Sequence, residues 1–142
     1  MLHWFPLLLI SVIVYNLLVF GGGAIAGGDV VATLESSVSF TMFSGDVWIF
    51  SLGDLIVLIS LCLLFFETVK ATRTTASGLL NHGASMLVFV VAIVEFLVVP
   101  GFSTTTFFFI MVMTFFDVVA GFTISIVAAR RDLGLGGGLI GG

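Results

Sequence analysis

The sequence predicts an all-α, polytopic membrane protein with four transmembrane helices and with both termini on the inner side. Three observations support this fold class: 60% of the 142 residues are hydrophobic, only 8% are charged, and the mean hydropathy is +1.35. Soluble domains contain about 25% charged residues, so this chain has too few charges to cover a soluble surface. The length allows one domain, which we expect to comprise residues 1–142.

Four apolar segments are long enough to cross a bilayer. A helix rises about 1.5 Å per residue and needs about 20 residues to cross a hydrocarbon core of about 30 Å. The four segments cover residues 2–20, 47–66, 79–99 and 105–129. Their nearly continuous apolar runs favour helices over the alternating strands of a membrane barrel. Residues 21–46 are then an outer loop, and the glycine-rich tail, 133–142, is expected to be flexible.

The four positively charged residues indicate the orientation, because lysine and arginine accumulate on the inner side of a membrane. Lys70 and Arg73 lie between the second and third segments, and Arg130 and Arg131 follow the fourth. An even number of helices places all four residues on one side. The outer loop contains acids but no lysine or arginine. We therefore expect a multi-pass protein of the bacterial inner (cytoplasmic) membrane with both termini inside.

The first segment has one alternative interpretation. Residues 7–20 could form the core of a signal peptide, with Ala24, Ile25 and Ala26 as the cleavage site. However, the residues before this core include no lysine or arginine. We therefore favour a retained first transmembrane helix.

The outer loop has a mixed composition that fits two local structures. Val31, Leu34, Val38 and Met42 match one face of a short helix, whereas Val38, Phe40 and Met42 also match the alternation of a strand. The loop could cap the bundle or lie on the membrane surface, and it could instead be a docking surface for a partner. We favour the first role.

Polar residues within the apolar segments are the strongest candidates for a functional site, because an ionised carboxylate is costly in hydrocarbon. Asp54 lies in the second segment, Glu95 in the third and Asp117 near the middle of the fourth. Asn16 of the first segment is expected at the depth of Glu95, and Glu67 is expected to reach the inner interface. Desolvation favours the neutral form of a carboxyl group, so the three intramembrane acids could bind and release protons or ions.

Two other roles for these acids remain open. They could form hydrogen bonds within the chain and fix its packing, or they could bind groups on a neighbouring subunit. Small and hydroxyl residues allow helices to approach closely, and the predicted packing residues are Gly53, Ser60, Thr114, Gly121 and Ser125. The last three share one face of the fourth segment with Asp117.

Several functional classes are disfavoured by composition. Four lysines and arginines cannot neutralise a useful run of phosphates, so nucleic acid is a poor partner. Cys62 is the single cysteine, and no paired His or Cys motif is present, so we expect no metal site. No nucleophile has a recognisable base, so we do not expect an enzyme. The 16 phenylalanines could contact a bound lipid, quinone or pigment, but no dedicated cofactor is expected.

Two functions remain compatible with these features. We favour a non-catalytic accessory or structural subunit of a larger membrane protein complex, which packs through aromatic and small-residue helix faces. The alternative is a small proton- or ion-coupled transporter or channel component that uses the intramembrane carboxylates. This alternative requires a homo-oligomer, because four short helices rarely enclose a full pathway. In both cases the partners are the lipid bilayer and other membrane subunits or further copies of the chain.

Overall fold

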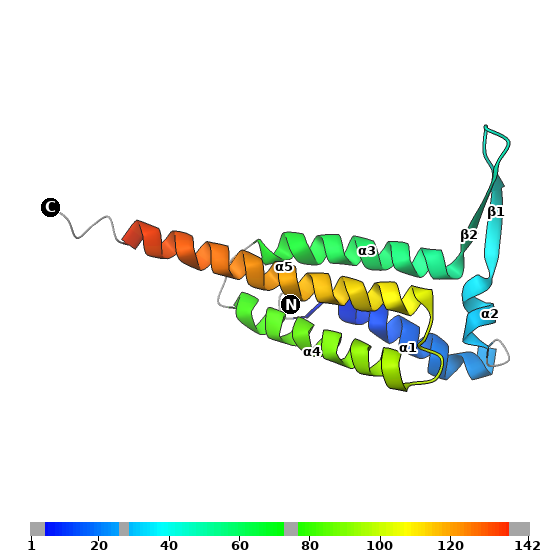
Figure 1. Ribbon diagram of the computed structural model, residues 1–142, viewed down its shortest axis with the longest axis horizontal. Helices are drawn as coiled ribbons and strands as arrows, with labels where there is room; N and C mark the ends of the chain where they lie inside the picture. The colour runs from blue at the N-terminus through cyan, green and yellow to red at the C-terminus, as the bar shows by residue number, and fades with distance from the viewer. Residues whose placement is uncertain (1–4, 26–28, 73–76, 137–142) are drawn as a thin grey trace.

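The computed structural model describes residues 5–25, 29–72 and 77–136, and the fold is mostly helical. The elements in chain order are α1 (Leu8–Ile25), α2 (Val30–Glu35), β1 (Ser37–Thr41), β2 (Val47–Ser51), α3 (Leu52–Ala71), α4 (Ser77–Val98) and α5 (Thr105–Gly136). Figure 1 shows the four long helices as a bundle, with the β1–β2 hairpin extending away from one end. We call this end the hairpin end and the opposite end the far end.

Among the described residues, three helices are long and apolar enough to cross a membrane: Leu52–Ala71, Asn81–Val98 and Thr105–Val127. The corresponding apolar stretch of α1, Leu8–Gly21, is shorter. Large apolar side chains on the outside of these helices are exposed, including Leu58 of α3 and Leu87 of α4. The fold is therefore compatible with an integral membrane protein.

The second apolar segment becomes helical at Leu52 rather than at residue 47. Residues Val47–Ser51 form a strand that pairs antiparallel with Ser37–Thr41. The chain reverses near Gly45, whose φ of +91° suits glycine. Hydropathy alone does not reveal this boundary, because valine, isoleucine and the aromatic residues are apolar in a strand as well as in a helix.

Two other predicted boundaries also differ from the structure. The outer loop predicted for residues 21–46 includes the end of α1, the short helix α2 and β1. The fourth segment does not end at residue 129, because α5 continues through Arg130 to Gly136. Arginine is a good helix former, so the two arginines end the apolar stretch without ending the helix. Residues 137–142 of the predicted flexible tail lie outside the described residues.

The apolar core is centred on three aromatic side chains near the hairpin end. Tyr15 of α1, Phe102 of the α4–α5 connection and Phe107 of α5 are fully buried. The Tyr15 ring centroid lies 5.4 Å from that of Phe102 and 4.7 Å from that of Phe107. The Tyr15 hydroxyl donates to the Gly101 carbonyl at 3.2 Å and also contacts the Thr104 hydroxyl. These contacts pack α1 against the start of α5.

Candidate functional site

Six polar side chains from three helices gather inside the bundle near its far end, and we call them the far-end polar cluster. They are Glu67 and Lys70 of α3, Asn81, His82 and Ser85 of α4, and Asp117 of α5. Five of them are at most 3% exposed, and the Lys70 side chain is 17% exposed. Burial of so many polar groups is costly unless they are paired, so their partners decide what the cluster does.

The α3 part of the cluster is a paired network around the Glu67 carboxylate. The Lys70 ammonium lies 2.8 Å from Glu67 Oε1. Asn81 donates to the same oxygen at 2.6 Å, and the backbone N–H of Leu7 donates to Oε2 at 2.9 Å. Lys70 also donates to the carbonyl of Phe5 at 2.9 Å. This network compensates the buried charge and ties α3 to α4 and to the segment before α1.

The α4–α5 part of the cluster has unused hydrogen-bonding capacity. The Ser85 hydroxyl lies beside the Asp117 carboxyl group. Neither Ser85 Oγ nor His82 Nδ1 has a hydrogen-bond partner of normal geometry among the described residues. Buried polar atoms are almost always paired, so these two stand out. An imidazole, a hydroxyl and a carboxyl group in one buried region can bind a proton or a small polar guest.

Gly121 provides the space for the His82 ring. It lies one turn after Asp117 on α5, and a Cβ at this position would overlap His82 Nδ1. The small residue therefore allows α4 and α5 to approach at the cluster, which is the role of small residues at close helix contacts.

Gly121→Ala is expected to lower the free energy of unfolding by about 1–3 kcal/mol, because the added methyl group must displace the buried imidazole. Gly83→Ala is the matched control on α4, since a Cβ there meets no atom within 4 Å. Unfolding of both variants in detergent micelles, followed by circular dichroism, measures the difference. Equal midpoints for the two variants would contradict the close contact between His82 and Gly121.

Asn16 and Glu95 form a second polar contact, closer to the hairpin end. Asn16 Nδ2 donates to Glu95 Oε1 at 3.0 Å and to the carbonyl of Val12 at 3.0 Å. Glu95 Oε2 is buried and has no partner among the residues that the structure describes. The structure thus brings together two residues that the sequence places at similar depth, and their contact joins α1 to α4.

Asp54 belongs to neither of these polar groups, and it lies at the start of α3 rather than well inside the second apolar segment. Because α3 begins at Leu52, Asp54 belongs to its first turn and is exposed. Its carboxylate accepts from the Ser51 N–H at 2.9 Å and from the Ser51 hydroxyl at 2.7 Å. These two residues form a capping box, and a negative charge at a helix N-terminus is favourable.

The other predicted packing residues differ in how deeply they are buried and in what they contact. Ser60 is fully buried, and its hydroxyl lies 2.8 Å from that of Ser11, which links α3 to α1. Gly53 is buried, and a Cβ there would lie 2.6 Å from the Thr106 hydroxyl. Thr114 is buried and donates to a carbonyl of its own helix, whereas Ser125 is only half-buried.

The paired part of the far-end polar cluster was not anticipated from the sequence. The sequence indicates only a topology role for Lys70, as for Arg73, which lies outside the described residues, and for Arg130, which is exposed. It predicts an interfacial position for Glu67. The signal for the pair is spacing: Glu67 and Lys70 are three residues apart on α3 and are therefore neighbours on its surface.

No protein-family model, curated protein or solved structure matches this chain. Within the described ranges, no three His, Cys, Asp or Glu side chains gather closely enough to hold a metal ion. The fold and the site therefore define a class only: a helical protein with membrane-compatible helices and a buried polar cluster.

Proposed function

We propose that this chain is a non-catalytic accessory subunit of a larger membrane protein complex, with four transmembrane helices, both termini inside, in a bacterial inner membrane. The observation that carries the proposal is that three of the acids in its apolar helices have structural partners in separate places. Glu67 pairs with Lys70, Glu95 binds Asn16, and Asp54 caps α3. Each acid thus holds parts of this chain together.

An apolar layer between the two buried polar groups supports a packing role over transport. Val88 and Ala92 lie between Ser85 and Glu95 on α4, and they are 7% and 0% exposed. They belong to the apolar core together with Ile110 of α5. Ser85 and Glu95 are separated by about 15 Å along the helix, at about 1.5 Å per residue. The buried hydroxyl groups of Ser11, Ser60 and Thr114 already form hydrogen bonds within this chain, so this layer offers few free polar partners to a proton or ion that crosses a single copy.

The outer surface of the bundle offers aromatic faces for other membrane helices. Neighbouring phenylalanines are exposed on α3 and α5, namely Phe65, Phe66, Phe108, Phe109, Phe115 and Phe116. In lipid, helices associate through van der Waals packing and through small or polar residues at the contact. Exposed aromatic side chains supply a large area for such packing with a partner subunit.

A second candidate function is a small oligomeric proton- or ion-coupled transporter component. In this role, the side chains of Asp117, Glu95 and Asn16 bind the proton or ion as it crosses the membrane. One specific observation favours it: His82 Nδ1 and Ser85 Oγ have no hydrogen-bond partner among the described residues, close to Asp117. Histidine changes its charge near neutral pH, which suits proton exchange with a carboxyl group. A second copy of the chain would have to complete the path past the apolar layer.

Gentle extraction from the native membrane followed by native mass spectrometry separates the two functions. For the accessory role, we expect a stoichiometric complex with a different membrane protein. A homo-oligomer without other subunits would overturn this role and favour the transporter component. In that case, Asp117→Asn should abolish proton uptake into liposomes, whereas the exposed-acid control Glu35→Gln should retain it.

A further inference from the structure

The β1–β2 hairpin has one face made of large apolar side chains. In an antiparallel pair, directly opposed residues point to the same side. Val38 lies opposite Phe50, and Phe40 lies opposite Trp48. The Trp48 ring centroid lies 5.9 Å from that of Phe40 and 5.2 Å from that of Phe50. We call these four side chains the aromatic face.

The other face of the hairpin differs in composition. It carries Ser37, Ser39 and Thr41 on β1, opposite Ser51, Ile49 and Val47 on β2. Phe40 and Trp48 on the aromatic face are each 50% exposed, and Val38 is 58% exposed. Because an isolated two-stranded hairpin is marginally stable in water, covering this exposed aromatic face would stabilise the hairpin.

The direction of the hairpin relative to the bundle indicates what covers this face. Figure 1 shows β1 following α2 and β2 ending at the start of α3, with both strands running across the direction of the long helices and beyond the side of the bundle. If α3 crosses a bilayer, the hairpin therefore runs along the membrane surface at the level where the helix emerges. This step rests on the membrane-spanning position proposed above for α3.

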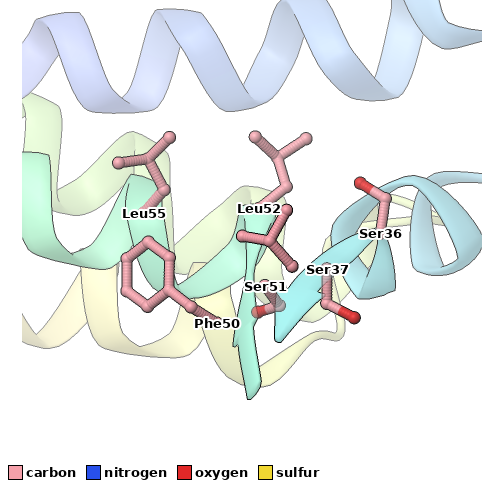
Figure 2. A pocket seen from close by; sticks show the side chains of 7 residues that line it. Ser36, Ser37, Phe50, Ser51, Leu52 and Leu55 are labelled. Atoms are coloured by element: carbon pink, nitrogen blue, oxygen red, sulfur yellow. The ribbon is translucent and has the colours of Figure 1, made fainter. Parts of the chain in front are cut away.

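The aromatic face is turned toward the lipid-facing side of α3. Val38 and Phe50 line the same hollow, of about 360 Å³, as Leu52 and Leu55 of α3, and Figure 2 shows the Phe50 ring beside Leu55. Leu55 is exposed and lies one turn before the exposed Leu58. The aromatic face thus continues the apolar surface of α3, and the two surfaces meet the same lipid.

We propose that the aromatic face of the hairpin is inserted into the interfacial layer of the bilayer leaflet at the hairpin end. Tryptophan and other amphipathic aromatic residues concentrate in this layer. The backbone groups at the free edges of a two-stranded sheet are unpaired and need water or headgroups. The hairpin is therefore kept out of the hydrocarbon core. Asp46, the charged residue of the hairpin, lies at its turn and is exposed, so no charge is buried by this insertion.

The position of tryptophan fluorescence in vesicles tests the proposal, because the chain has only two tryptophans, Trp4 and Trp48. In Trp4→Phe, Trp48 is the single emitter. In phosphatidylcholine vesicles it is expected to lose most of its fluorescence to lipids brominated close to the headgroup, and less to lipids brominated near the chain ends. Aqueous iodide should have little effect on it.

Two further variants, both carrying Trp4→Phe and Trp48→Phe, provide the controls. Val47→Trp places the emitter on the opposite face of β2, where iodide should quench it and brominated lipid should not. Leu58→Trp places it on the exposed side of α3, about 9 Å from the helix start at about 1.5 Å per residue, where lipids brominated along their chains should quench it and aqueous iodide should not. The Leu58→Trp result tests the membrane-spanning helix independently of the hairpin.

The outcomes separate the hairpin proposal from the proposed membrane placement. Quenching of Trp48 by iodide and not by brominated lipid would overturn the insertion and place the hairpin in water. Protection of Trp48 from both quenchers would also overturn it, because the aromatic face would then be covered by protein. If Leu58→Trp is not quenched by any brominated lipid, the spanning position of α3 itself fails.

Discussion

Glu67→Ala is expected to lower the free energy of unfolding by about 3–5 kcal/mol, which is typical when one partner of a buried ion pair is removed. The Lys70 ammonium, 17% exposed, would lose its carboxylate partner. Asn81 and the backbone N–H of Leu7 would lose their acceptor in the same step. The cost arises mainly from the charge and the donors that stay buried, because leaving such groups unpaired carries their full desolvation penalty.

Reversible unfolding in mixed detergent micelles, with increasing denaturing detergent, measures this loss. Glu35→Ala is the control, because Glu35 is exposed at the end of α2 and exposed sites change stability by about 0.5 kcal/mol or less. Replacing both Glu67 and Lys70 by methionine should recover only part of the lost stability, since no buried charge is then left unpaired but Asn81 and the Leu7 N–H still lack their acceptor. A loss below about 1 kcal/mol for Glu67→Ala would contradict a buried pair, because exposed pairs contribute this little.

The sequence predicts the helical character of the chain well, because long apolar runs determine it locally. Residues 79–99 and 105–129 are predicted as helices, and α4 and α5 cover most of both ranges. The sequence also predicts a similar depth for Asn16 and Glu95, and the structure shows that the two side chains form a hydrogen bond. The number of spans and their orientation remain predictions.

The hairpin could not be located from composition, because pairing rather than hydropathy makes residues 47–51 a strand. Its partner strand, 37–41, lies on the other side of the turn at Gly45, and each strand is stabilised only by the other. The same shift of the helix start places Asp54 in the first turn of α3, where it caps the helix.

The far-end polar cluster depends on how the helices are rotated against one another. Glu67 and Asn81 are 14 residues apart and belong to different helices, and Asp117 comes from a third. Periodicity shows which residues share a face on one helix, but it does not show which faces meet. The sequence therefore does not indicate that Asn81 belongs to the cluster, whereas the three-residue spacing of Glu67 and Lys70 does indicate that these two are neighbours.

Phe107→Ala is expected to lower the free energy of unfolding by about 3 kcal/mol, near the lower end for large aromatic residues in protein cores. Phe107 is fully buried between Tyr15 and Phe102, with ring centroids at 4.7 Å from both. Its removal leaves a cavity where α1 meets the start of α5. Packing carries most of this cost, because lipid offers apolar contact to the unfolded helices as well.

Phe109→Ala is the matched control two residues further along α5, because Phe109 is 46% exposed. The two positions differ by about 200° around the helix, so they point to nearly opposite sides. A lipid-facing ring keeps similar surroundings in the folded and dissociated helices, and its loss should cost less than about 1 kcal/mol. The same detergent unfolding experiment compares both variants. Equal losses, or a larger loss for Phe109→Ala, would mean that α5 is rotated differently, and the buried positions of Asp117 and Gly121 would fail with it.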